Sequence, residues 1–178
     1  GNLFDDVPMG NMPVFGLENR RYLGCKSKLA EWILSIINNE AQGAYSFFDI
    51  FAGTGAIGRK ALEYYQEVIF NDFLCSNVVS YKAFFADGEL NKERVQDFIR
   101  EMNNVDASSL DGNYCSHYYG NKYFGMAAAK KIGYIRDEIE RRKNEFSEKE
   151  YFVLVASLIY SADRIANTTG QFEAYRKN

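Results

Sequence analysis

The order of apolar and polar positions predicts a chain of helices interrupted by two short strands. The first helix is indicated by five apolar residues at the spacing of one helix face: Leu29, Trp32, Ile33, Ile36 and Ile37. Asn38, Asn39 and Gly43 follow this run, and residues of these types commonly end a helix. We therefore expect a helix that starts near residue 29 and ends before Gly43.

A strand, a glycine-rich turn and another helix follow. The apolar run from Phe47 predicts a buried strand, and it ends at the turn Gly53-Thr54-Gly55. A second strand, Val68 to Asp72, ends 23 residues after Asp49. Strand, helix and strand together predict a parallel βαβ unit with a right-handed crossover. No clear strand follows, so either strands are missed or the fold continues beyond this chain.

The rest of the chain has a mainly helical pattern. Its apolar positions predict helices over about 74–85, 90–102, 126–143 and 148–165. Ser147 and Glu150 have the spacing of a capping box, which marks the start of the last helix. Residues 103–123 are polar and rich in tyrosine, so we expect a loop there. The chain after Asn167 predicts a turn-rich hairpin or loop.

Composition limits the class of protein. The 178 residues suit about one domain, and the net charge of −3 still permits a local basic strip for nucleic acid. Three cysteines without a CxxC pair, together with the single His117, argue against a disulfide framework, a zinc site or another metal site. The sequence shows no membrane-spanning run and no signal peptide, so we expect a cytoplasmic protein.

The glycine turn is the first candidate site. Glycines let a ligand approach the backbone, and Asp49 lies where open α/β sheets bind ligands. No Lys-Ser or Lys-Thr pair follows the last glycine, so the turn is not a P-loop. The alternative is a plain turn between a strand and a helix. Asp72 ends the next strand and could accept hydrogen bonds from a ribose, although a helix cap is the other explanation. Phe73 could cover an adenine ring.

A basic loop precedes the first predicted helix. It contains Tyr22, Gly24 and Lys26, and amide donors gather at such a helix start. Lys26 could neutralise a carboxylate, or the loop could simply be a solvated basic segment. A ligand that combines ribose, adenine and carboxylate is S-adenosylmethionine.

At this point the sequence resembles the D12 class of adenine-N6 DNA methyltransferases, which includes Dam-like enzymes and the methylase partners of some type II restriction enzymes. Four segments match in the family's order: Arg21 to Lys26, Phe48 to Gly55, Asn71-Asp72, and Arg164 to Phe172. Cys25 departs from the small Ser or Gly that is usual there. The resemblance implies an α/β fold, with an incomplete Rossmann-like S-adenosylmethionine-dependent methyltransferase core and a mostly helical target-recognition insert.

The resemblance also implies domains and site residues. We expect an N-terminal arm (1–19), the cofactor part of the core (20–87) and a helical insert that ends in a DNA-recognition segment (88–178). The implied cofactor-binding residues are Tyr22, Gly24, Lys26, Asp49, Phe51, Gly53, Gly55, Asp72 and Phe73. The implied contacts with double-stranded DNA are Arg164, Asn167, Thr168, Gly170, Gln171, Phe172 and Tyr175. The alternative is that Arg164 caps the end of the last helix and that Asn167 to Gly170 form a simple turn. The strip from Lys130 to Lys143 is interleaved with acids, which favours a solvated helix face.

One motif of the family is absent. Its catalytic Asp/Asn-Pro-Pro-Tyr/Phe loop orients the adenine amino group, and this chain has only the separated Pro8 and Pro13. We therefore expect a fragment that is inactive alone and is completed by a C-terminal half or a second chain. The alternatives are a non-catalytic remnant that binds DNA or cofactor, one half of a split methyltransferase, and a small-molecule or RNA methyltransferase with the same glycine turn.

Overall fold

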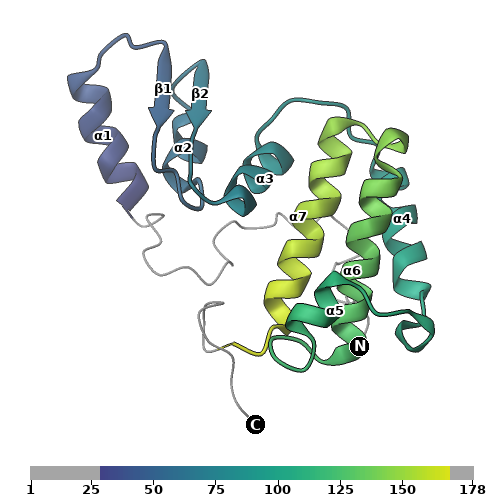
Figure 1. Ribbon diagram of the computed structural model, residues 1–178. Coiled ribbons are helices and arrows are strands. Elements are labelled where there is room, and N and C mark those ends of the chain that lie inside the picture. Colours follow the sequence, from purple (N-terminus) through teal and green to yellow (C-terminus); the bar gives the residue numbers. More distant parts are fainter. Residues whose placement is uncertain (1–28, 169–178) are drawn as a thin grey trace. The chain divides into compact units, whose positions relative to one another are not determined.

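The computed structural model describes residues 29–168, which form two compact units (Figure 1). We call residues 29–86 the strand unit and residues 87–168 the helical unit. The boundary follows Ala86.

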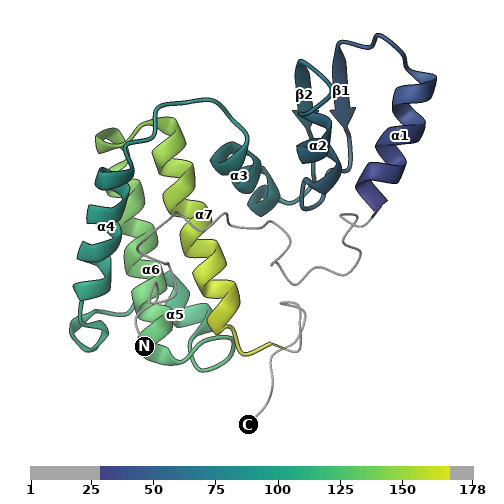
Figure 2. The ribbon, with the colours of Figure 1, turned by 180° about the vertical axis from the view of Figure 1, so that it is seen from behind.

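The strand unit contains a parallel βαβ arrangement, as the sequence predicts. Its elements are α1 (Ala30–Glu40), β1 (Ser46–Asp49), α2 (Ala56–Ala61), β2 (Glu67–Phe70) and α3 (Cys75–Phe84). The two strands pair in parallel, with Phe48 opposite Ile69. The ribbon shows them side by side with the same direction, connected through α2 (Figures 1 and 2).

The core of the strand unit lies on one face of the sheet. Ala30 and Leu34 of α1 pack with Ile57, Ala61 and Tyr65, and three half-buried residues complete the cluster: Ile33, Phe47 and Val68. The Tyr65 hydroxyl donates a hydrogen bond of 2.6 Å to Asn38 Oδ1, so its polar end is satisfied.

Two details of the sequence-based prediction are wrong in this unit. The helix α1 buries Ala30 and Leu34, whereas Leu29, Trp32 and Ile36 from the predicted apolar face are exposed. The strand β1 is not buried on both faces, because Phe48 is exposed, as is its partner Ile69. Within the described residues, helices cover one face of the two-stranded sheet, so only alternate side chains enter the core.

The helical unit consists of four α-helices and two short 3₁₀ turns. They are α4 (Lys92–Asn104), η3 (Ala107–Ser109), α5 (Tyr114–Tyr119), α6 (Met126–Arg141), η4 (Lys143–Glu145) and α7 (Glu148–Ile165). Both views show α4, α6 and α7 side by side (Figures 1 and 2). Their buried apolar residues follow helical spacing: Val95, Phe98 and Met102 on α4, Ile132, Ile135 and Ile139 on α6, and Leu154 and Leu158 on α7.

The capping box predicted at residue 147 is confirmed and has a further function. Ser147 Oγ accepts from the Glu150 N–H, and Glu150 Oε2 accepts from the Ser147 N–H. Fully buried Glu150 also accepts a hydrogen bond of 2.8 Å from the Asn91 N–H and one of 3.0 Å from Arg94 Nη1. One carboxylate therefore joins the starts of α4 and α7.

The predicted loop over 103–123 is wrong, because this segment contains η3 and α5. Asn113 caps α5 in a capping box with Ser116, and its side-chain amide donates to the Lys130 carbonyl at 2.7 Å. The amide thus ties the start of α5 to α6. Tertiary contacts of this kind stabilise a six-residue helix that lacks an apolar period of its own.

The described residues are thus mostly helical, with a two-stranded parallel sheet as their only sheet. The larger Rossmann-like sheet stays an expectation. No helix within residues 29–168 is long and apolar enough to cross a membrane.

Candidate functional site

The turn after β1 is held against the residues that follow β2. The Asn71 N–H donates to the Asp49 carbonyl at 2.9 Å, and the Ala52 N–H donates to the Asn71 carbonyl at 2.9 Å. The Asn71 side chain adds a bond of 2.8 Å to the Ile50 carbonyl. Backbone pairing therefore continues past the ends of both strands and fixes the start of the glycine turn.

Asp72 connects three elements at this edge. Its Oδ2 accepts a hydrogen bond of 2.8 Å from the Gly53 N–H, and its Oδ1 accepts bonds of 2.9 Å from the Leu74 N–H and from Asn77 Nδ2. Leu74 is the N-cap residue of α3 and no described side chain caps this helix, so Asp72 does not act as the expected cap; it ties the residue before α3 and the Asn77 side chain to the glycine turn.

The two glycines of the turn differ in their surroundings. Gly53 and Gly55 have φ angles of +58° and +79°, which favour glycine. A Cβ placed on Gly53 would meet no described atom within 4 Å, whereas one on Gly55 would lie 3.2 Å from the rings of Tyr81 and Phe85. Gly53 therefore borders open space that a ligand could enter, and Gly55 permits close packing against α3.

Two aromatic rings flank the turn and are exposed. Phe51 lies in the turn, and Phe73, which follows Asp72, is 97% exposed. Asp49 is buried at the end of β1. At the carboxyl ends of the two parallel strands lie a glycine beside open space, a carboxylate that accepts hydrogen bonds from the turn, and two exposed aromatic rings. This arrangement suits a nucleoside ligand.

Sequence reasoning missed two residues that support this turn. The Tyr81 hydroxyl donates to the Gly53 carbonyl, and Asn77 bonds to Asp72 as described above. Both lie on α3, and neither stands in a recognisable motif, so only the folded chain identifies them.

Several predicted site residues lie outside the described part of the chain. For the cofactor these are Tyr22, Gly24 and Lys26, and for DNA they are Gly170, Gln171, Phe172 and Tyr175. Their roles stay predictions.

The described part of the predicted DNA segment lies at the end of α7. Arg164 is exposed, with its guanidinium 6.0 Å from the Tyr160 ring centre. The Asn167 N–H donates to the Tyr123 carbonyl at 2.7 Å, so this segment lies beside the turn between α5 and α6. Thr168 is buried. Arg164 is therefore the most accessible of the three predicted DNA contacts that the structure describes.

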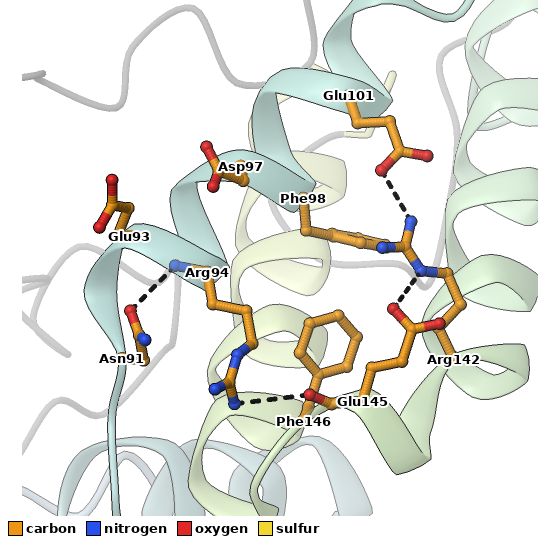
Figure 3. Close-up of a pocket in the computed structure, with 9 residues that line it drawn as sticks. All are labelled: Asn91, Glu93, Arg94, Asp97, Phe98, Glu101, Arg142, Glu145 and Phe146. Carbon is orange, nitrogen blue, oxygen red and sulfur yellow. Dashed lines mark hydrogen bonds and ion pairs between the residues drawn. The ribbon is translucent and has the colours of Figure 1, made fainter.

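A hollow of about 260 Å³ lies between α4 and η4 in the helical unit (Figure 3). Arg142 bonds to Glu101 at 2.7 Å and to Glu145 at 2.9 Å, with its guanidinium 5.1 Å from the Phe98 ring centre. Arg94 is paired with buried Glu150. Because both arginines of the hollow are neutralised by carboxylates, it does not suit a phosphate group.

Known DNA methyltransferases are similar to this chain over most of its length. The family described as D12 class N6 adenine-specific DNA methyltransferase matches residues 22–178. The chain is 34% identical over 165 residues to type II methyltransferase M.CviAII of Paramecium bursaria Chlorella virus 1, and 33% identical over 170 residues to type II methyltransferase M.NlaIII of Neisseria lactamica. Each alignment covers 88% of this chain and 49% of the relative.

A third relative, type II methyltransferase M.FokI of Planomicrobium okeanokoites, is 30% identical over 173 residues, which cover 89% of this chain and 27% of that protein. The chain thus spans about half the length, or less, of these curated relatives. No solved structure matches the chain.

Proposed function

The chain belongs to the family of D12 class N6 adenine-specific DNA methyltransferases, and we propose that it supplies the methyl-donor site and part of the DNA-binding surface of such an enzyme. The proposed reaction transfers a methyl group from S-adenosylmethionine to adenine N6 in double-stranded DNA. Family membership supports the reaction class, and the described geometry supports the location of the donor site.

The bond between Asp72 and Gly53 carries the proposed cofactor site. It holds a positive-φ glycine with open space beside it against the acidic residue that ends the next strand. In this proposal Asp72 accepts a hydrogen bond from one ribose hydroxyl, while the Gly53 backbone allows close approach. Phe73 covers the adenine ring of the cofactor.

The remaining site residues have supporting roles in the proposal. Phe51 and Gly55 shape the turn, and buried Asp49 fixes its start. Lys26 neutralises the carboxylate of the cofactor, with Tyr22 and Gly24 in the same loop. When bound, the cofactor supplies an electrophilic sulfonium methyl group, and the chain's own residues bind and orient it.

The proposed DNA contacts come from the end of α7 and the residues after it. Arg164 and Asn167 are residue types that reach phosphates and base edges. Thr168, Gly170, Gln171, Phe172 and Tyr175 complete the proposed segment. The helical unit serves as its scaffold, in line with a target-recognition insert after the cofactor part of the core.

Calorimetric titration of S-adenosylmethionine into the chain tests the cofactor site. We expect saturable binding to the wild type, at least tenfold weaker binding to Asp72→Ala and unchanged binding to Asp163→Ala, which alters an acid of the helical unit. Equal affinities of the three proteins would remove the proposed ribose contact. A wild type that binds no cofactor would overturn the site as a whole.

A second candidate is a cofactor- or DNA-binding protein without catalysis of its own, or one half of a split enzyme. It is a candidate because residues 1–178 contain only the prolines Pro8 and Pro13 and so do not include the family's adjacent-proline loop. Radiolabelled methyl transfer to DNA distinguishes the candidates. Transfer by the chain alone would exclude the non-catalytic candidate, whereas cofactor binding without transfer favours it or the split enzyme.

A further inference from the structure

A compact group of tyrosines covers α5 and the turn that follows it. We define the tyrosine patch as Tyr114, Tyr118, Tyr119, Lys122 and Tyr123. Ring centres lie 4.6 Å apart between Tyr114 and Tyr118, 6.3 Å apart between Tyr114 and Tyr119, and 6.0 Å apart between Tyr119 and Tyr123. The rings thus form one continuous aromatic surface.

This surface is open to solvent and polar at its edges. Tyr114 is 70% exposed and Tyr118 is 52% exposed, whereas tyrosine is intermediate in its usual burial. The proximity of Tyr114 raises the pKa of Tyr119 further above its ordinary value of 10.0, and a tyrosine hydroxyl already keeps its proton at neutral pH. Exposed rings with hydroxyl donors can stack on or lie against a partner and also donate hydrogen bonds to it.

The charge around the patch favours an anionic partner. Residues 112–136 contain no Asp or Glu, although the whole chain has 24 such residues. Lys130 and Lys131 of this stretch donate to the carbonyls of Leu110 and Asn103, and Arg136 pairs with Glu140. Exposed Lys122 has no ion pair within the described part of the chain, so its charge can serve a partner.

The patch is continuous with the proposed DNA segment. The bond of 2.7 Å from the Asn167 N–H to the Tyr123 carbonyl connects the two directly. The turn that contains Lys122 also has an internal bond of 2.7 Å from the Asn121 N–H to the Phe124 carbonyl, so its shape is fixed. DNA that reaches the end of α7 would therefore lie close to the patch.

From these observations we propose that the tyrosine patch is a contact surface for the sugar–phosphate backbone of duplex DNA, beside the segment proposed to contact the target site. The inference rests on the proposed function, because it extends the DNA surface of that function. Lys122 neutralises one phosphate, the Tyr114 and Tyr118 rings lie against sugars, and tyrosine hydroxyls donate to phosphate oxygens. Such contacts position the protein and do not depend on the base sequence.

Fluorescence anisotropy with a labelled duplex of mixed sequence tests the proposal, since backbone contacts need no recognition site. We expect Lys122→Ala to weaken binding of the full chain and to reduce the slope of log affinity against log salt by about 0.9, the value for one neutralised phosphate. Tyr114→Ala and Tyr118→Ala should each weaken binding by up to about fivefold, since a ring that lies against a sugar contributes less than a ring stacked on a base, which is worth about 1–3 kcal/mol. Tyr118→Phe should retain most of the ring contribution.

Matched controls are available in the same protein. Tyr45→Ala and Tyr64→Ala remove tyrosines of similar exposure from the strand unit, and Lys92→Ala removes an exposed lysine at the start of α4. We expect these three variants to bind like the wild type. Circular dichroism and thermal unfolding verify that each patch variant is folded.

The outcomes separate this inference from the proposed function. If the wild type binds the duplex and the patch variants bind equally well with the same salt slope, the patch does not contact DNA, while the proposed function stands. If the wild type binds no duplex DNA, the inference and the DNA-binding part of the proposed function are both overturned, while the donor site is tested separately by the cofactor titration. Loss of affinity restricted to the patch variants supports the inference.

Discussion

The carboxylate of Asp72 accepts a hydrogen bond of 2.8 Å from the backbone N–H of Gly53, 19 residues earlier in the chain. This bond closes the glycine turn of one strand onto the end of its neighbour. The same carboxylate accepts from the Leu74 N–H and from the Asn77 side chain, so one side chain ties the turn to the beginning of α3. Asp72 is therefore a structural residue of the turn as well as the proposed ribose contact.

Asp72→Asn should loosen the turn without removing much volume. An amide retains one acceptor oxygen but presents N–H groups to some of the donors, so at least one backbone donor loses its partner. We expect the free energy of unfolding to fall by about 1–3 kcal/mol. The Gly53 amide should exchange its hydrogen faster, measured by NMR. Glu67→Gln, which changes an exposed acid on β2, is the control, and unchanged exchange at Gly53 would contradict the role of the bond.

Gly53→Ala and Gly55→Ala should separate ligand binding from stability. Both impose a positive φ on alanine, at about 1–2 kcal/mol. Gly55→Ala also places Cβ 3.2 Å from the Tyr81 and Phe85 rings, which adds about 1–3 kcal/mol. We expect Gly55→Ala to lower the melting temperature more than Gly53→Ala does. Relative to its loss of stability, Gly53→Ala should cause the larger loss of cofactor affinity. Calorimetry measures the cofactor affinity and thermal unfolding measures the stability. Equal losses of affinity and of stability in the two variants would refute the distinction.

Glu150 should make the stability of the helical unit depend on acid pH. Burial by itself raises the pKa of Glu150, but two backbone N–H groups and the Arg94 guanidinium outweigh it and hold the pKa below its ordinary value of 4.5. The unfolded chain therefore binds this proton at higher pH than the folded one. The stabilisation is present above about pH 4.5 and is lost as pH falls through the lower folded pKa.

Glu150→Gln tests this dependence. We expect a loss of about 1.5–3 kcal/mol at neutral pH, the range for hydrogen bonds to a charged group. Urea denaturation at several pH values measures the free energy of unfolding, and the difference in this free energy between variant and wild type should become smaller at acid pH. Glu93→Gln, at an exposed position in the first turn of α4, serves as control. A difference that stays constant down to strongly acid pH would argue against the depressed pKa.

Gly133→Ala should disturb the attachment of α5 to α6. A Cβ on Gly133 would lie 2.2 Å from Asn113 Oδ1, and Asn113 is held by its cap and by its bond to the Lys130 carbonyl. We expect the clash to outweigh the helix preference of alanine and to cost about 1–3 kcal/mol. Gly125→Ala, whose Cβ meets no described atom within 4 Å, should cost less than about 1 kcal/mol. Thermal unfolding compares the two, and equal effects would mean that Asn113 can move aside.

Most of the regular elements of this protein could be predicted from local sequence, with η3, α5 and η4 as the exceptions. The capping box at Ser147 and Glu150 is confirmed, and α7 covers Glu148–Ile165 as expected. The glycine turn between two parallel strands is likewise observed. Capping groups and glycines act on their nearest neighbours in the chain, so their effect is already encoded in short stretches of sequence.

Which face of an element is buried could not be predicted in this way. The spacing of Leu29, Trp32 and Ile36 satisfied a helical period, yet Ala30 and Leu34 enter the core. Both faces of α1 carry apolar residues, so the choice depends on the partners Ile57, Ala61 and Tyr65, which the folded chain brings to it. The same limit explains the exposed Phe48 in a strand expected to be buried.

The sequence by itself determined the family resemblance, the order of the elements other than η3, α5 and η4, and Asp72 and Gly53 as candidate site residues. Only the tertiary structure decided that these two residues bond to each other, that α5 forms from an apparent loop, and that Tyr123 lies beside Asn167. The first and last of these contacts join residues that are distant in the chain, and the contacts of α5 stabilise a helix that is too short to form alone. Their free energy depends on the packing of the whole unit, which no local pattern specifies.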